Sequence, residues 1–175
     1  ERQGNRLLTL VTQLLDISKV KSVIGEPNWQ HGNICAQVAM LLETYIDYAA
    51  NRGVTLKYHY DKAIEMDFVP DYVNKVMSNL VSNALKFTPN GGTISVNLYQ
   101  RGDRLHIDVS DTGHGISSDK LAHIFEPFYT TGDMGETKGT GIGLALTQEI
   151  ISHLNGTITA ESQVGKGTTF HIVMP

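Results

Sequence analysis

Apolar residues recur at helical spacing close to the start of the chain. The intervals of three and four are formed by Leu7, Leu10, Leu14 and Ile17, with Leu8, Val11 and Leu15 on a flanking stripe. This pattern predicts a helix with a wide apolar face, which is typical of a bundle or a dimer interface. An ordinary core helix of the same domain is the alternative. Residues 25–28, Gly-Glu-Pro-Asn, interrupt the pattern and predict a linker.

Two further helices are predicted by the same periodicity. Asn33 is a suitable N-cap for the first, which ends at residues 51–53, Asn-Arg-Gly. The apolar face of this helix carries Ile34, Val38, Leu41, Leu42, Tyr45 and Ala49. The next helix starts at Val69 and stops before Pro89, and its apolar positions are Tyr72, Val73, Val76, Leu80, Val81 and Leu85.

The remaining pattern predicts strands and one last helix. Residue types favour strands at 55–60, 93–99, 105–109, 156–161 and 168–173. Arg-Gly-Asp at 101–103 joins two of these strands as a β-hairpin, and residues 141–154 are predicted to be helical. The sum predicts an α+β domain with one mostly antiparallel sheet and its helices on a single face.

Composition narrows the class of protein. A chain of 175 residues suits one domain with an appended helical segment. Eighteen acidic residues against 14 Lys and Arg give a net charge of −4, which argues against nucleic-acid binding as the main task. The single cysteine, Cys35, excludes an internal disulfide framework. No apolar run approaches the ~18 residues of a membrane span, and no signal peptide is found. We expect a soluble protein from a reducing compartment, excised from a longer one because it lacks an initial methionine.

The first stretch with candidate chemistry lies in the predicted helix after Val69. Asn79 and Asn83 are four residues apart, so both amides lie on one helix face. Neutral oxygen donors suit Mg²⁺, which takes its remaining ligands from phosphates and water. Lys86 could reach a phosphate as a point charge. The alternative is that all three are ordinary solvated surface residues.

The second stretch, Asp111-Thr112-Gly113-His114-Gly115, directly follows a predicted strand. Its glycines let the backbone bend sharply near a flat ligand, and the Asp111 carboxylate could accept a hydrogen bond from an exocyclic amine such as that of adenine. Aspartic proteases share Asp-Thr-Gly but need two such carboxylates, and this chain has one copy. A simple strand-to-helix turn remains the alternative, and His114 is predicted to be a tolerated loop residue.

The third and fourth stretches frame a glycine-rich segment. Phe125 and Phe128 flank Pro127, and the polar residues 129–138 that follow predict a mobile lid, although both phenylalanines could equally fill the core. Residues 138–146, with Gly139, Gly141 and Gly143, lead straight into a helix, whose unpaired N–H groups attract anions. This is neither a standard P-loop nor a dinucleotide fingerprint. A phosphate-binding turn at a helix start is the prediction that survives.

Together, and in this order, the four stretches resemble the N, G1, F and G2 boxes of the ATP-binding catalytic domain of sensor histidine kinases, in the GHKL superfamily. The resemblance covers residues 32–175 and includes residues 165–170, Gly-Lys-Gly-Thr-Thr-Phe, which are similar to the family's last motif. It implies a two-layer α/β sandwich of the Bergerat type with ATP and Mg²⁺ as cofactors.

The resemblance also implies a division of the chain. Residues 5–21 are similar to the second helix of the family's dimerisation domain, so we expect a partial dimerisation helix at 1–24, a linker at 25–32 and the catalytic domain at 33–175. The family's phosphoacceptor histidine would precede that helix and is not among the seven histidines of this chain. We therefore expect a fragment whose acceptor helix was removed.

The roles implied by the resemblance centre on one nucleotide. Asp111 would bind the adenine amine, Asn83 and Asn79 would hold Mg²⁺, and Lys86 would contact a phosphate. The implied nucleotide-binding residues are Asn83, Lys86, Phe87, Asp111, Gly113, Gly115, Ile116, Phe125, Phe128, Lys138, Gly139, Thr140, Gly141, Ile142, Gly143, Leu144, Thr168 and Thr169. Of these, Thr168 or Thr169 would line the base pocket.

One residue favours a branch of the superfamily. The ATPases of the superfamily carry a glutamate base where this chain has Asn79, which cannot accept a proton from water at neutral pH. The resemblance therefore implies phosphoryl transfer to a histidine of the protein's own dimerisation domain, with a response-regulator receiver domain as the next partner. It implies a homodimer in the full-length protein, a cytoplasmic location in a membrane-bound bacterial sensor, and no direct membrane or nucleic-acid contact by this chain. A nucleotide-gated interaction module without phosphotransfer and a GHKL ATPase are the alternatives.

Overall fold

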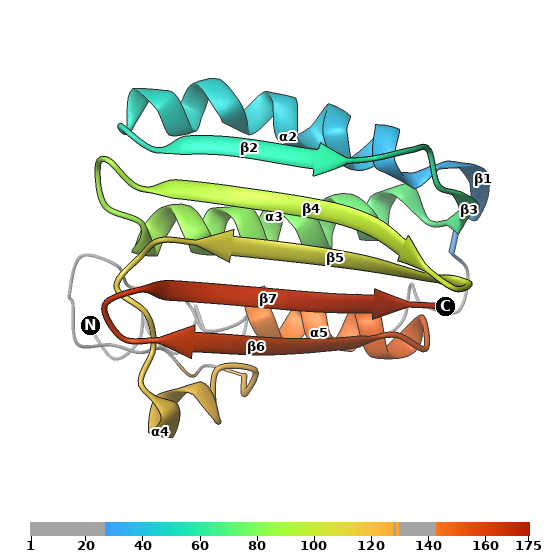
Figure 1. The fold of residues 1–175 in the computed structure, drawn as a ribbon. Helices are drawn as coiled ribbons and strands as arrows, with labels where there is room; N and C mark the ends of the chain where they lie inside the picture. Colours follow the sequence, from blue (N-terminus) through green and yellow to red (C-terminus); the bar gives the residue numbers. More distant parts are fainter. Residues whose placement is uncertain (1–26, 128, 130–142) are drawn as a thin grey trace, which may run out of the picture.

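The computed structural model describes residues 27–127, 129 and 143–175 (Figure 1). The helix expected at 1–24, Phe128, and most of the predicted lid and glycine-rich segment therefore lie outside the described residues. The elements, in chain order, are β1 (Gln30–Asn33), α2 (Ile34–Asn51), β2 (Thr55–Tyr60), β3 (Glu65–Phe68), α3 (Pro70–Phe87), β4 (Thr93–Arg101), β5 (Arg104–Asp111), α4 (Ser118–Leu121), α5 (Gly143–His153), β6 (Thr157–Gln163) and β7 (Gly167–Met174).

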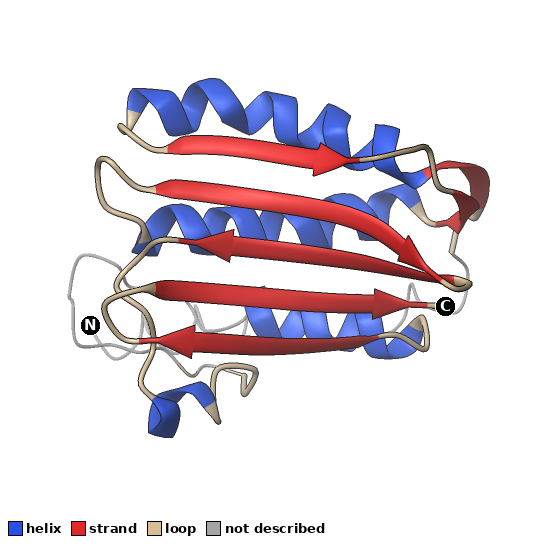
Figure 2. Ribbon diagram, in the orientation of Figure 1, coloured by secondary structure: helices blue, strands red, loops and turns tan. Residues whose placement is uncertain are grey.

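Five strands form the main sheet in the order β2-β4-β5-β7-β6. Only β2 and β4 run parallel, and every other neighbouring pair in this sheet is antiparallel. The helices α2, α3 and α5 lie side by side on one face of the sheet (Figures 1 and 2). The predicted α+β class, with a mostly antiparallel sheet and helices on a single face, is confirmed.

The predicted cap of α2 is also confirmed. The Asn33 side-chain oxygen accepts hydrogen bonds from the backbone N–H groups of Cys35, at 3.0 Å, and Ile64, at 3.1 Å. One asparagine thus caps α2 and fixes the strand connection that leads to β3. Sequence reasoning missed the pairing behind this contact, since β1 and β3 form a separate two-stranded antiparallel ribbon.

Helix α3 packs along the centre of the helical layer. It begins with Pro70 at its first turn, carries Asp71 there and Lys86 in its last turn, and ends two residues before Pro89. Both charges suit the helix dipole. Its buried face consists of Tyr72, Val76, Met77, Leu80, Val81, Ala84 and Leu85.

Strand alternation places the core between sheet and helices. Buried side chains from β4, β5 and β7 point to the helices: Ile94, Val96, Leu98, Leu105, Ile107, Val109, Phe170 and Ile172. No helix of the described part is long and apolar enough to cross a membrane.

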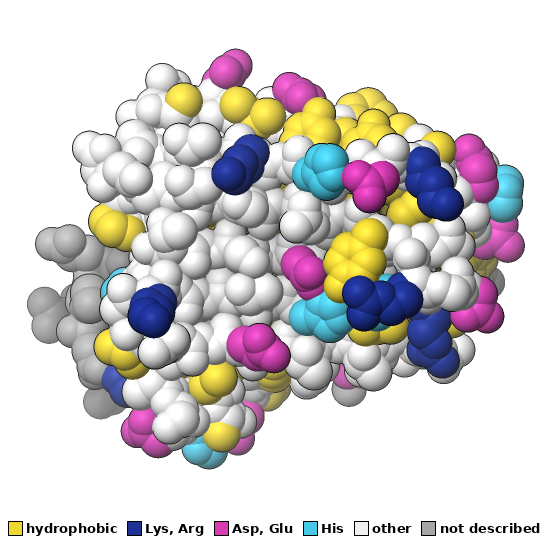
Figure 3. Space-filling model, in the orientation of Figure 1, with side chains coloured by type: hydrophobic (Ala, Val, Ile, Leu, Met, Phe, Trp, Pro, Cys, Tyr) yellow, Lys and Arg dark blue, Asp and Glu magenta, His cyan; other side chains and the backbone are white. Residues whose placement is uncertain are grey.

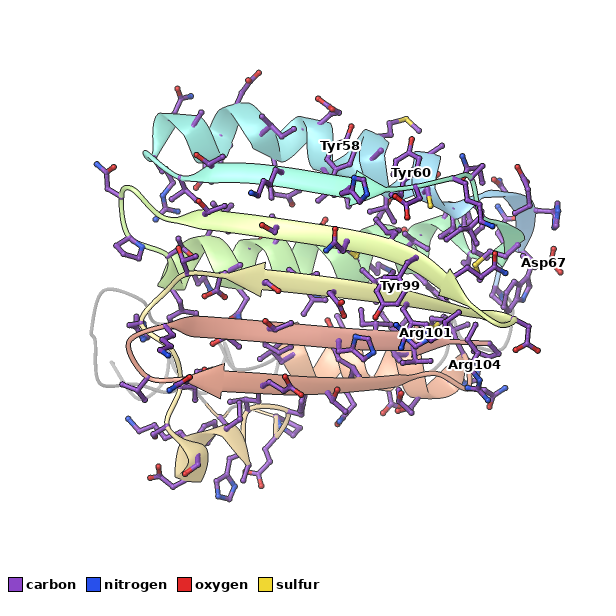
Figure 4. All side chains as sticks on the ribbon, in the orientation of Figure 1. Tyr58, Tyr60, Asp67, Tyr99, Arg101 and Arg104 are labelled. Carbon is purple, nitrogen blue, oxygen red and sulfur yellow. The ribbon has the colours of Figure 1, made fainter. Side chains whose placement is uncertain are left out.

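The other face of the sheet is open and carries polar, charged and aromatic groups (Figure 3). The His171 ring contacts the Asp108 carboxylate, and His106 Nδ1 lies 3.3 Å from His171 Nε2. Tyr99 stacks on His106 with ring centroids 5.0 Å apart, and the Arg101 guanidinium lies 5.5 Å from the Tyr99 centroid (Figure 4). Burial lowers the pKa of His106, and the neighbouring His171 and Arg101 lower it further.

Candidate functional site

Asp111 ends β5 opposite Thr168 of β7. Its Oδ1 accepts hydrogen bonds from the backbone N–H groups of Gly113, at 2.9 Å, and Thr168, at 3.3 Å. Both bonds end on one oxygen, so the carboxylate is held in a fixed orientation, and its Oδ2 makes no hydrogen bond within the described residues. Burial raises the pKa of Asp111, and the hydrogen bonds from Gly113 and Thr168 act in the opposite direction.

The glycines after Asp111 are required by close packing. A Cβ on Gly113 would lie 2.4 Å from the Phe87 carbonyl oxygen at the end of α3. Gly115 has φ +77°, and its Cβ would lie 2.2 Å from the Gln163 carbonyl oxygen of β6. The sequence predicted close backbone approach here, but the approach is to α3 and β6, which the turn thereby joins.

A serine that sequence reasoning missed holds this turn to the sheet. The Ser162 hydroxyl accepts a hydrogen bond from the Ile116 N–H at 2.7 Å. The same Oγ lies 3.0 Å from the Gly167 carbonyl oxygen, to which it donates, and 2.8 Å from the Thr168 hydroxyl. Ser162 lies in no motif, and no sequence signal would have identified it.

Asn79 links two helices. Its Nδ2 donates to the Gly143 carbonyl oxygen and to the Thr147 hydroxyl, both at 3.3 Å, and Thr147 Oγ1 also donates to that carbonyl at 2.9 Å. The alternative of a simply solvated surface asparagine is therefore wrong for Asn79. Because the nitrogen is engaged between α3 and α5, a metal would have to take the amide oxygen.

Asn83 and Lys86 continue along α3 toward the Asp111 turn. Asn83 is half-buried and Lys86 is exposed. Neither side chain makes a hydrogen bond or ion pair within the described residues. The last residue of the helix, Phe87, contacts the His114 ring edge-on with centroids 5.3 Å apart. The end of α3 and the Asp111 turn are thus in direct contact.

The two threonines of the last motif point to opposite faces of the sheet. Thr168 is buried and faces the helices beside Asp111. Thr169 is on the open face, where its hydroxyl lies 2.9 Å from that of Ser110. Strand alternation therefore favours Thr168 as the neighbour of Asp111 on the helical face, and the role expected of Thr169 stays a prediction.

A hollow of about 390 Å³ opens at the Asp111 end of the sheet. It is lined by Asp111 and by residues of β6, β7 and their connecting turn: Glu161, Ser162, Gln163, Lys166, Gly167, Thr168 and Thr169. Asn79 and Asn83 do not line it. The predicted residues Lys138, Gly139, Thr140, Gly141 and Ile142 lie outside the described residues, whereas Gly143 and Leu144 begin α5.

Phe125 packs on the core. Its ring meets the buried Phe170 edge-on, with centroids 6.2 Å apart and an interplanar angle of 82°. The core-filling interpretation therefore holds for Phe125. Phe128 lies outside the described residues, and its predicted part in a lid remains a prediction.

Comparison with known proteins shows which family has a sequence similar to that of this chain. Residues 69–175 match the family described as Histidine kinase-, DNA gyrase B-, and HSP90-like ATPase, a description that implies ATP binding. Sensor histidine kinase RppB of Synechocystis sp. is 33% identical over 184 residues, covering all of this chain and 39% of RppB. Sensor histidine kinase WalK of Bacillus subtilis is 29% identical, covering all of this chain and 29% of WalK.

The fold has a solved counterpart in the catalytic domain of histidine kinase ThkA. That structure superposes with a TM-score of 0.75 at 23% identity, covering 85% of this chain and 97% of ThkA's. The chain spans less than half the length of both curated relatives, so it corresponds to one part of such a protein. The family match covers more than half of the chain, from α3 to the C-terminal residue, and the resemblance to sensor histidine kinases is confirmed. The chain therefore belongs to the family of histidine kinase-, DNA gyrase B- and HSP90-like ATPases, as a catalytic domain of the sensor histidine kinase type.

Proposed function

We propose that this chain binds Mg-ATP between α3 and the Asp111 turn, and that it donates the γ-phosphoryl group to a histidine on another domain. The observation that supports this proposal most directly is the geometry of Asp111. Its carboxylate is fixed through one oxygen by two backbone N–H groups. An acceptor oriented in this way can select a base by its donor pattern. The exocyclic amine of adenine satisfies Oδ2, whereas the guanine carbonyl at the same ring position would face it acceptor to acceptor.

Oxygen donors on α3 would hold the metal. Amide oxygens suit Mg²⁺, which binds through one or two protein groups and completes its shell with phosphate oxygens and water. Among the described residues no cluster of three or more His, Cys, Asp or Glu could hold a metal ion by itself. The two asparagine amide oxygens fit a metal that arrives with its nucleotide. We assign Asn83 as the main ligand, with Asn79 nearby through its Oδ1.

Residues near the end of α3 and around the Asp111 turn would make the other contacts with the nucleotide. Lys86, exposed in the last turn of α3 and unpaired within the described residues, would neutralise phosphate charge. Thr168, Gly113, Gly115, Ile116 and Phe87 would form the base end of the site. The glycine-rich residues 138–144 would offer backbone N–H groups to the phosphates at the start of α5.

Asn79 supports transfer rather than hydrolysis. An amide cannot accept a proton from water at neutral pH, and its nitrogen already donates to Gly143 and Thr147. Phosphoryl transfer depends mainly on positioning and charge neutralisation, so the acceptor histidine can come from elsewhere. We propose that it belongs to the dimerisation domain of which residues 1–24 are a part, in a homodimeric cytoplasmic sensor that passes the phosphoryl group to a receiver domain.

The proposed phosphoryl transfer is tested by adding a separate domain that carries an acceptor histidine. The chain is incubated with γ-labelled ATP, Mg²⁺ and a separate helical domain that carries the acceptor histidine. We expect acid-labile label on the added domain and none on this chain alone. Nucleotide binding without any label transfer would support a nucleotide-gated module instead. Steady phosphate release by the chain alone would support an ATPase.

A further inference from the structure

Three polar residues form a row across neighbouring strands at the Asp111 end of the sheet. Thr168 of β7 is paired in register with Asp111 of β5 on one side and with Ser162 of β6 on the other. These three strands lie next to one another in the sheet (Figure 1). Residues that are paired in register point to the same face of a sheet, so the three side chains are neighbours. All three residues line the hollow of about 390 Å³.

The hydroxyl of Ser162 has three polar neighbours and a single proton. It accepts the Ile116 N–H at 2.7 Å, and its oxygen lies 3.0 Å from the Gly167 carbonyl oxygen and 2.8 Å from Thr168 Oγ1. A carbonyl oxygen can only accept a hydrogen bond, so the serine proton goes to Gly167. The Thr168 hydroxyl must then donate its own proton to Ser162, whose oxygen can accept two hydrogen bonds. All three contacts are satisfied at once only in this arrangement.

The direction of these hydrogen bonds determines what the row offers to a ligand. With its proton committed to Ser162, Thr168 Oγ1 keeps only the capacity to accept. The ionised Asp111 carboxylate is an acceptor as well, and its Oδ2 makes no hydrogen bond within the described residues. The row therefore favours a ligand edge that carries N–H groups over one that carries a carbonyl oxygen. A threonine that was free to rotate would offer its proton to such a carbonyl, and the distinction would be lost.

We propose that Ser162 is a positioning residue for base selection. It orients the Thr168 hydroxyl as an acceptor, and through the Ile116 N–H it holds the turn that follows Asp111. This inference rests on the proposed nucleotide site, and it adds the group that sets the preference of that site for adenine over guanine. Ser162 acts through Thr168 and through the turn.

The chain offers a matched control one register position away. Ser110 and Thr169 are also paired across β5 and β7, and their hydroxyls are 2.9 Å apart, but they lie on the open face of the sheet. Ser110→Ala therefore removes a serine hydroxyl that contacts a threonine of β7 without changing the row. Ser162→Ala removes the serine hydroxyl that contacts Thr168.

The first test measures the affinities of the full chain for ATP and GTP, with Mg²⁺, by calorimetry. We expect Ser162→Ala to lower the ratio of ATP affinity to GTP affinity about fivefold, the effect of one lost hydrogen bond, because the released Thr168 hydroxyl can donate to the guanine carbonyl. Ser110→Ala should keep the parent ratio. A general loss of structure would weaken the binding of both nucleotides alike and would leave the ratio unchanged.

The outcomes of this test distinguish the inference from the proposed function. A parent chain that binds ATP without preference over GTP, or an unchanged ratio in Ser162→Ala, would overturn the inference alone. A parent chain that binds neither nucleotide would refute the proposed function, and the inference with it.

A second variant keeps the inference testable if Ser162→Ala does not fold. Thr168→Val has nearly the same shape and keeps the backbone N–H that Asp111 accepts, but it lacks the hydroxyl. It should lower the same affinity ratio, and Ser162→Ala should lower the ratio less in a Thr168→Val background than in the parent. Equal losses in both backgrounds would show that Ser162 does not act through Thr168.

A measurement without nucleotide tests the contact with the turn. Hydrogen exchange of the Ile116 amide should be about tenfold faster in Ser162→Ala than in the parent chain, and Ser110→Ala should exchange as the parent does. Equal exchange in all three proteins would show that Ser162 does not hold the turn, and this result would count against the inference whatever the chain binds.

Discussion

Asp111 and Thr168 face each other across β5 and β7, and the Thr168 N–H donates to the Asp111 carboxylate at 3.3 Å. The same oxygen accepts the Gly113 N–H at 2.9 Å. The strand pairing that builds the sheet therefore also aims the carboxylate, so the fold itself sets the geometry of the proposed base contact.

Replacing Asp111 should separate binding from stability. Asn is isosteric and its Oδ1 can keep both backbone hydrogen bonds, but its NH₂ would face the adenine amine donor to donor. We expect Asp111→Asn to lose at least tenfold in ATP affinity by calorimetry, while its circular dichroism spectrum stays that of the parent. Unchanged affinity would contradict the proposed base contact.

The stability of the same variant should depend on pH. The folded-state pKa of Asp111 is raised by burial, so between its ordinary value of 3.8 and the higher folded value the folded state binds more protons. Ionisation at neutral pH is therefore a cost to folding. We expect Asp111→Asn to be at least as stable as the parent at pH 7, with the advantage shrinking as the pH falls to about 4, as measured by urea unfolding.

Substitution of Asn79 and substitution of Asn83 in α3 should have different effects. Asn79→Ala removes two hydrogen bonds between α3 and α5, so we expect a loss of about 1 kcal/mol in unfolding free energy without nucleotide. The Asn83 side chain makes no hydrogen bond within the described residues, so Asn83→Ala should leave the unfolding free energy unchanged. It should weaken ATP binding only when Mg²⁺ is present. Identical thermal and binding profiles of the two variants would argue against this division of roles.

Two glycines with positive φ provide a matched pair. Gly91 has φ +94°, and a methyl group added there would meet no atom within 4 Å, whereas the Cβ of Gly115→Ala would lie 2.2 Å from the Gln163 carbonyl oxygen. Gly91→Ala should cost about 1 kcal/mol, the usual penalty of the left-handed region. Gly115→Ala should cost clearly more and should also weaken ATP binding, because it displaces the Asp111 turn. Equal losses for both would show that the close approach is relaxed in solution.

His106 should make the domain less stable in mild acid. Burial lowers its pKa, with His171 and Arg101 lowering it further, so the unfolded chain takes up a proton first as the pH falls below about 6.5. Stability from this group is present above that pH and is lost below it, down to the folded pKa. We expect His106→Gln to flatten the pH dependence of the melting temperature between pH 7.5 and 5.5. A slope equal to that of the parent would show that His106 does not contribute.

The sequence was sufficient for elements whose chemistry is local. Apolar periodicity gave α2 and α3, the Asn33 cap was identified from residue type, and the turn at Gly102 gave the hairpin. The family motifs directed attention to the Asp111 turn and to Asn79 and Asn83, whose roles toward a nucleotide stay predictions. What local patterns could not supply were contacts between distant segments: the β1–β3 ribbon, the Ser162 hydroxyl under Ile116, and the engagement of Asn79 by Gly143. Thr168 and Thr169 could be separated only once the register of β7 was known.

Helix α3 has a consequence for how the two ends of the molecule communicate. Its 18 residues, about 27 Å long, carry Tyr72 in the first turn and Lys86 in the last. Because one continuous helix joins these two ends, a small tilt at its first turn displaces Asn83 and Phe87 sideways against the Asp111 turn, which Phe87 contacts through the His114 ring.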